Sequence, residues 1–133
     1  MMNNRDNLIS IIVPCYNEEH AIPYFYKAIT EHSTLMKNEF GVDFEYLFIN
    51  DGSVDNTLTV LKEYANKDNR VKYISFSRNF GKESAMYAGL KNASGNYIAI
   101  MDADLQDPPY LLTEMYKTII ESDYDCVATR RTT

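Results

Sequence analysis

The chain has 133 residues, of which 45% are hydrophobic and 24% charged, and its formal net charge is −6. These values fit one soluble globular domain, and the length is too short for two. We predict no nucleic-acid partner, because the chain is acidic and has no run of basic residues. Cys15 and Cys126 form no metal-binding pattern and are expected to be reduced thiols. No apolar run approaches the roughly 20 residues that span a bilayer, so we expect a cytoplasmic chain.

Apolar runs and amphipathic stretches alternate along the sequence. The apolar runs predict strands at 8–13, 44–49, 71–75, 97–101 and 125–129. Between them we predict helices from a cap at Asn17 to Gly41, over 58–65 after a cap at Ser53 or Asp55, from about 83 to 90, and over 110–121. This alternation predicts an α/β fold with a mostly parallel sheet and helices on both faces.

Two aspartates follow the predicted strand 97–101, which is apolar on both faces and is expected to be buried. In an extended chain Asp102 and Asp104 point to the same side, so their carboxylates converge. Carboxylates this close repel each other unless a cation lies between them. Gln106 adds a neutral oxygen, and oxygen donors suit Mg²⁺ or Mn²⁺. A divalent cation site is therefore predicted here, with solvated turn acids as the alternative.

Other polar clusters also follow predicted strands, and the carboxyl ends of parallel strands are where such folds bind ligands. Asp51 could form a turn with Gly52 or accept a nucleobase N–H, and its spacing leaves both possibilities open. Arg78 and Lys82 could be solvated or could bind phosphate. Neither the dinucleotide-binding nor the P-loop glycine pattern is present.

Four motifs together resemble a known family: IVPCYNE at 12–18, NDGSVDNT at 50–57, SRNFGKE at 77–83 and DADLQDPP at 102–109. They resemble the GT-A glycosyltransferases of family 2, from about residue 8 to residue 133. More narrowly, they look like the polyprenyl-phosphate branch, which contains dolichyl-phosphate mannose synthases and bactoprenol glucosyltransferases. The resemblance implies a GT-A, Rossmann-like fold and a UDP- or GDP-linked sugar donor.

The resemblance also implies roles for residues at motif positions. Residues expected to bind the donor are Pro14, Tyr16, Glu18, Asp51, Arg78, Lys82 and Asp102. Asp102 and Asp104 are expected to be catalytic and, with Gln106, to bind Mg²⁺ or Mn²⁺. Arg130 and Arg131 would meet acceptor or donor phosphate. Many relatives have aspartate at the position of Asn50, which leaves Asp51 as the sole acid there.

The implied function is inverting, metal-assisted transfer of a sugar to a polyprenyl phosphate. A family 2 transferase acting on a saccharide hydroxyl and an inactive nucleotide-binding fragment are the alternatives. Relatives continue well past the last residue, so residues 1–133 are expected to form a single GT-A domain truncated at the C-terminus. The full-length protein is expected at the cytoplasmic face of the membrane. The sequence predicts no oligomeric state.

Overall fold

The structure is a computed structural model that describes residues 7–122. Within these residues strands and helices alternate along the chain, as predicted. The elements are β1 (Leu8–Cys15), α1 (Ala21–Phe40), β2 (Asp43–Asn50), α2 (Thr57–Lys67), β3 (Val71–Ser75), α3 (Lys82–Asn92), β4 (Tyr97–Ile100) and α4 (Tyr110–Glu121). The predicted strand 125–129 lies outside the described residues. No helix within 7–122 is both long and apolar enough to cross a bilayer.

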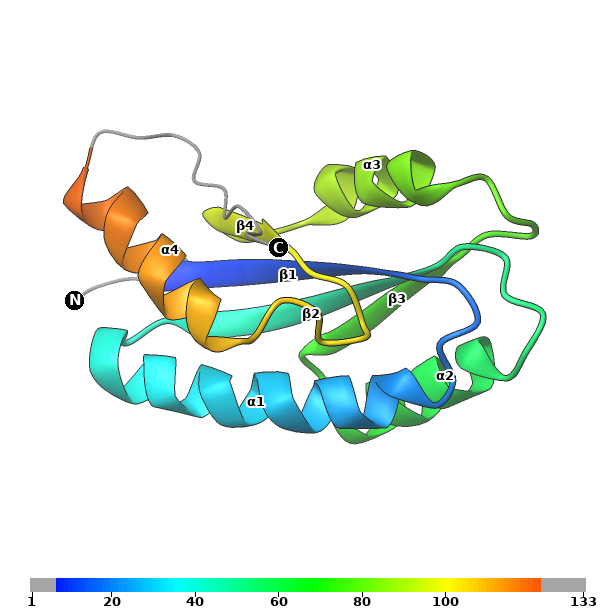
Figure 1. Cartoon of the computed structure of the whole chain (residues 1–133), viewed down its shortest axis with the longest axis horizontal. Helices are drawn as coiled ribbons and strands as arrows, with labels where there is room; N and C mark the ends of the chain where they lie inside the picture. The colour runs from blue at the N-terminus through cyan, green and yellow to red at the C-terminus, as the bar shows by residue number, and fades with distance from the viewer. Residues whose placement is uncertain (1–6, 123–133) are drawn as a thin grey trace.

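The strands form a parallel sheet in the order β3-β2-β1-β4. Helices α1 and α2 lie against one face of the sheet and α3 lies against the other (Figure 1). The register pairs Cys15 with Asn50 and Asn50 with Ser75, so β1, β2 and β3 end at the same level. The predicted α/β class, with helices on both faces of a parallel sheet, is confirmed.

Alternate residues of β1 and β2 face opposite layers, which is why both strands are largely apolar on both faces. On the α1 side, Ile11 and Phe48 are fully buried in the larger core cluster, where the Phe48 ring meets the edge of Phe25. On the α3 side, Ile12 packs in a smaller cluster. A β-carbon at Gly89 would lie 2.4 Å from Ile12 Cγ2, so only glycine lets α3 approach β1 this closely.

The expectation that the strand at 97–101 is buried on both faces was wrong. Tyr97 and Ala99 pack against the larger core cluster, but Ile98 is 43% exposed and Ile100 is 38% exposed. The reason is the position of α3, which packs over β1 and β2. Within residues 7–122, β4 is an edge strand whose α3-side face is left partly open.

The predicted cap at Asn17 was also wrong. Helix α1 begins at Ala21 after His20, and Asn17 has a left-handed backbone with φ of 54°. Its side chain instead accepts a hydrogen bond from the N–H of Val54 in another loop. At the other end, Gly41 terminates α1 in the left-handed conformation with φ of 73°, as predicted.

The N-cap of the second helix is not one of the two predicted residues but the residue after Asp55. Asn56 occupies the N-cap position of α2 and makes no side-chain cap hydrogen bond. The predicted candidate Asp55 accepts a hydrogen bond from the N–H of Thr57, the first residue of the helix. Ser53 lies further out and binds the loop after β1. Asp55 thus bonds the start of the helix locally, whereas Ser53 makes a tertiary contact.

Candidate functional site

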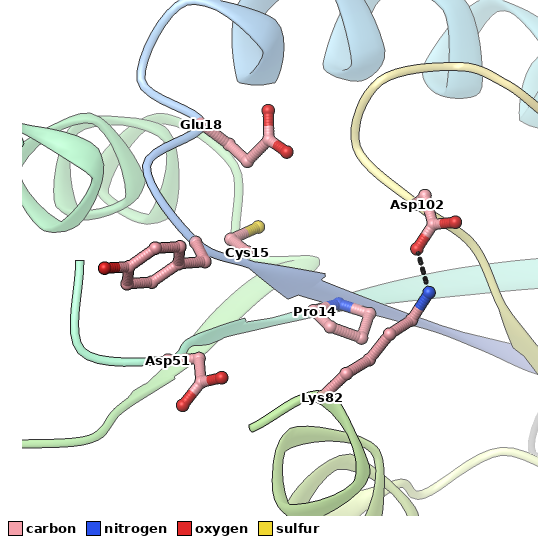
Figure 2. Close-up of a pocket in the computed structure, with 7 residues that line it drawn as sticks. Pro14, Cys15, Glu18, Asp51, Lys82 and Asp102 are labelled. Atoms are coloured by element: carbon pink, nitrogen blue, oxygen red, sulfur yellow. Dashed lines mark hydrogen bonds and ion pairs between the residues drawn. The ribbon is translucent and has the colours of Figure 1, made fainter. Parts of the chain in front are cut away.

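A pocket of about 180 Å³ opens at the carboxyl ends of β1 and β2, between them and the segment that follows β4 (Figure 2). Its lining residues are Pro14, Cys15, Tyr16, Glu18, Asp51, Lys82 and Asp102. All but Cys15 were predicted to bind the donor. The pocket therefore lies at the edge of the sheet where the polar clusters were expected to meet.

The loop after β1 is held by the loop after β2. Backbone N–H groups of Asn17 and Glu18 donate to Ser53 Oγ and Thr57 Oγ1, both at 2.9 Å. In return, Asn17 Oδ1 accepts the N–H of Val54 at 2.9 Å. The N–H of Glu19 also points to Asp55 Oδ2 at 3.3 Å. The two loops thus satisfy each other's backbone polar groups, which fixes the pocket wall that carries Glu18.

We call Asn17, Ser53, Asp55 and Thr57 the loop clamp. Only helix-capping roles were predicted for Asn17, Ser53 and Asp55, and no role was predicted for Thr57. Thr57 is fully buried, and its hydroxyl donates to Asp55 Oδ1 while accepting the N–H of Glu18. Asparagine adopts the left-handed backbone of position 17 more readily than most residues, and here its side chain bonds to the loop after β2.

Asp51 is buried at the end of β2, with an exposed fraction of 4%. Its two carboxylate oxygens accept the N–H groups of Phe80 at 2.8 Å and Gly81 at 3.1 Å. Gly52 turns the chain with φ of 67°, and a β-carbon there would lie 2.1 Å from the carbonyl carbon of Arg78. Asp51 and Gly52 therefore dock the loop before α3 onto the end of β2. Each carboxylate oxygen can accept more than one hydrogen bond, so the pocket-facing carboxylate keeps capacity for a ligand.

An ion pair crosses the pocket. Lys82 is the first residue of α3, and its Nζ lies 2.8 Å from Oδ1 of Asp102 in the segment after β4 (Figure 2). The side chains are 57% and 32% exposed, respectively. Of the described residues that line the pocket, Lys82 is the only basic one. The structure thus brings together two predicted site residues from distant parts of the sequence.

Asp104 and Gln106 lie beyond the pocket lining and pair with each other. Asp104 accepts the Gln106 N–H at 3.2 Å and its side-chain amide at 2.6 Å. Asp104 still acts on the site electrostatically: burial first, and then the charges of Asp104 and Asp102, raise the pKa of Glu18. Negative charge therefore accumulates along the side of the pocket that carries these three acids.

The predicted cation site offers the side-chain oxygens of Asp102, Asp104 and Gln106 as ligands. No cluster of three or more Asp, Glu, His or Cys side chains in residues 7–122 is placed to enclose a metal ion. Mg²⁺ and Mn²⁺ sites in nucleotide-binding proteins commonly use one or two carboxylates and take their remaining ligands from substrate phosphates and water. Asp102 and Asp104, with hard oxygen donors, fit a cation of that kind rather than a closed protein cage.

Arg78 does not line the pocket, although it was expected to bind the donor. It is exposed, and its guanidinium stacks over the Phe80 ring at 4.6 Å. Arg130 and Arg131 lie outside the described residues, so their predicted contact with phosphate stays a prediction.

Cys15 lines the pocket, although it was predicted only to be a reduced thiol. It is buried, and burial, followed by the charges of Glu18, Asp102 and Asp55, raises the pKa of its thiol. The thiol is therefore protonated and unreactive at neutral pH. Its position between Pro14 and Tyr16, at the exit of a buried strand, was the available signal that it would line the site.

The sequence of this chain is similar to those of a known protein family. Residues 10–133 match the sequence profile of Glycosyl transferase family 2. The chain is 49% identical over 100 residues to the bactoprenol glucosyl transferase of Shigella phage SfV, which covers 75% of this chain and 31% of that protein.

Two solved structures share the fold. S. aureus TarS 1-349 in complex with UDP is 29% identical, with a TM-score of 0.66 over 85% of this chain and 32% of that one. The mannosyltransferase PcManGT from Pyrobaculum calidifontis, solved with GDP-Man and Mn²⁺, is 22% identical, with a TM-score of 0.66 over 84% of this chain and 31% of that one. The expected GT-A type of fold is confirmed. The chain spans about a third of the length of these proteins.

Proposed function

Because this chain belongs to glycosyl transferase family 2, we propose that it forms the donor-binding part of an enzyme that transfers a sugar to a polyprenyl phosphate. The observation that carries the proposal is the pocket at the strand ends, where Asp51, Lys82 and Asp102 meet. Similarity to a bactoprenol glucosyl transferase supports the lipid phosphate as acceptor. Such an acceptor would place the full-length protein at the membrane, and we propose its cytoplasmic face.

The donor would be a UDP- or GDP-linked sugar, and UDP in the TarS structure supports the former. Pro14, Tyr16 and Glu18 would contact the nucleoside, with Asp51 accepting an N–H of the base. Lys82, at the N-terminus of α3, would face the diphosphate, since both its ammonium and the helix dipole favour anions there. Arg78, Arg130 and Arg131 remain candidates for further phosphate contacts.

Mg²⁺ or Mn²⁺ would be held by Asp102 and Asp104, with the Gln106 amide oxygen as a third protein ligand. A cation bound there would stabilise the negative charge that develops on the departing nucleoside diphosphate. Asp102 and Asp104 would thus contribute to catalysis by holding the cation that stabilises the leaving group.

In the proposed reaction, an oxygen of the lipid phosphate attacks the anomeric carbon of the sugar. The bond from that carbon to the β-phosphate oxygen breaks, and its electron pair leaves with the diphosphate. Attack from the face opposite the leaving group inverts the anomeric centre, through an oxocarbenium-like transition state. The phosphate acceptor is already an anion, so no base has to remove a proton from it. An acceptor hydroxyl, as in the alternative transferase, would need such a base.

The test is nucleotide binding by the chain and by the Asp104→Ala variant. Isothermal calorimetry with UDP, GDP and their sugars, each with and without Mn²⁺, should show Mn²⁺-dependent binding of one nucleotide to the unaltered chain. Asp104→Ala should abolish this binding and leave the fold intact, because Asp104 is exposed and, among the described residues, its side chain bonds only to Gln106 in its own turn.

The matched control is Glu63→Ala, which removes one exposed acid on α2. This variant should bind the nucleotide as the unaltered chain does. Undiminished affinity in Asp104→Ala would refute the metal assignment, and failure of every nucleotide to bind the unaltered chain would refute the donor site.

A further inference from the structure

The ion pair between Lys82 and Asp102 places a positive charge where the proposed function needs a divalent cation. The ammonium lies 2.8 Å from Asp102 Oδ1, at hydrogen-bond distance. An ammonium and a divalent cation cannot both bind this carboxylate oxygen closely, because like charges repel at such separations. Binding of the cation to that oxygen therefore requires the ammonium to leave.

The backbone of Lys82 is fixed while its side chain is free to move. Asp51 holds the N–H groups of the two preceding residues, Phe80 and Gly81, and so anchors the start of α3. The Lys82 side chain is 57% exposed and has a flexible four-carbon stem. Lys82 can thus swing about a stationary α-carbon without disturbing the helix.

The pocket offers the released ammonium a second partner once a donor is bound. Lys82 lies at the first position of an α-helix whose N-terminal N–H groups favour anions. Its three N–H donors suit phosphate oxygens. A diphosphate in the pocket would therefore attract the ammonium that the cation displaces from Asp102.

We propose that Lys82 is the resident counter-ion of Asp102 and that it is exchanged for the divalent cation when the donor binds. This inference rests on the proposed function. Its consequence is that the cation binds more weakly to the chain without a nucleotide, because it must displace an ammonium that has no second anionic partner within residues 7–122. Cation and nucleotide therefore each favour binding of the other.

The experiment measures Mn²⁺ binding without nucleotide, by electron paramagnetic resonance of the free ion, in Lys82→Gln and Lys91→Gln. Lys91 is an exposed lysine in the last turn of the same helix, so the two variants have equal net charge. Lys82→Gln should bind Mn²⁺ about fivefold more tightly than Lys91→Gln. A fivefold change in affinity corresponds to the most that a half-exposed ion pair usually contributes. Lys82→Arg keeps the positive charge and should behave like the unaltered chain.

The second arm measures nucleotide binding with Mn²⁺ present, using whichever of UDP and GDP binds the unaltered chain. Here Lys82→Gln should bind about tenfold more weakly than Lys91→Gln, because the diphosphate loses a charged hydrogen bond. The same substitution is thus expected to strengthen one interaction and weaken the other. Thermal unfolding should show both variants folded, with Lys82→Gln only slightly less stable because it loses its exposed ion pair with Asp102.

The exchange would be overturned if Lys82→Gln and Lys91→Gln bound Mn²⁺ alone with equal affinity, or if Lys82→Gln bound it more weakly. These results, with nucleotide still binding to the unaltered chain, would leave the donor site in place. If the unaltered chain bound no nucleotide in the presence of Mn²⁺, the proposed function and the exchange would both be refuted.

Discussion

Single residues with unusual backbone geometry hold the site together. Asn17 and Gly52 both have positive φ, at 54° and 67°, and both lie in loops that line or support the pocket. At Asn17 the left-handed backbone turns the side chain toward Val54. At Gly52 the missing β-carbon lets the backbone of Arg78 approach, which brings Lys82 toward the pocket. These local conformations convert neighbouring loops into one wall.

Gly52→Ala is expected to be far more harmful than Gly41→Ala. Both glycines have positive φ, but an added β-carbon would meet the backbone of Arg78 at 2.1 Å in one case and nothing within 4 Å in the other. We expect Gly41→Ala to lower the free energy of unfolding by about 1 kcal/mol, the cost of the left-handed backbone alone. Gly52→Ala should cost about 3 kcal/mol, since the loop must also shift. Urea unfolding followed by circular dichroism measures both, and equal losses would contradict the close approach.

At the scale of elements, the loops after β1 and β2 act as a unit through the loop clamp. Each of its four side chains accepts a backbone N–H from the other loop. No buried side-chain polar atom within residues 7–122 lacks a partner. Glu18 and Tyr16 are therefore positioned by a neighbouring loop, while their own loop contributes the left-handed turn at Asn17.

Thr57→Val should weaken both folding and nucleotide binding. The valine keeps the shape but leaves the N–H of Glu18 without its acceptor, at a cost of about 1–2 kcal/mol in the free energy of unfolding. Nucleotide affinity should fall as the pocket wall loosens. Thr57→Ser restores the hydroxyl and should recover most of the affinity. Thr59→Val, an exposed change on the same helix, is the control and should alter neither quantity, as calorimetry and thermal unfolding can check.

For the molecule as a whole, the two ends of the sheet carry different kinds of polar cluster. At the amino ends of the strands, buried Glu45 accepts hydrogen bonds from Ser10 Oγ, the N–H of Ser94 and Lys72 Nζ. This cluster ties the start of β4 to β1, because Ser10 Oγ also accepts the N–H of Gly95. The carboxyl ends instead carry the half-exposed ion pair and acids of the pocket.

Glu45→Gln should therefore reduce stability without affecting nucleotide binding. Burial alone favours the protonated acid, but the hydrogen bonds from Ser10, Lys72 and Ser94 outweigh it and lower the pKa of Glu45. A lowered pKa contributes stability above the unfolded value, near 4.3, and this contribution is lost as the pH falls.

At pH 7 the loss should be about 2 kcal/mol, and it should shrink as the pH is lowered through the acid range. Glu31→Gln, on the exposed face of α1, is the control. Thermal unfolding over a pH series tests the stability change, and calorimetry with nucleotide tests the affinity. A pH-independent difference between Glu45→Gln and the unaltered chain would contradict the role of the carboxylate.

The order of the elements was predictable because each β-branched or aromatic run is long enough to be a strand and each amphipathic stretch is a helix. The details that failed depend on tertiary contacts. Asn17 is a residue type that often caps helices, yet its side chain accepts a hydrogen bond from the N–H of Val54 in another loop. Ile98 and Ile100 look like buried strand residues, but their exposure depends on where α3 lies. Arg78, a predicted donor ligand, stacks on Phe80 outside the pocket lining, and its contact with phosphate stays a prediction.

The early end of β4 determines the shape of the pocket. Strand β1 continues through Pro14 and Cys15 after its ladder with β4 ends at Ile12 and Ile100. The chain then turns away through Leu105, whose φ is 59°, before Pro108 leads into α4. The hollow is thus the space that a longer strand would fill. Asp102 lies in the segment between Ile100 and Pro108, so the length of this segment sets the width of the pocket on that side while the sheet stays unchanged.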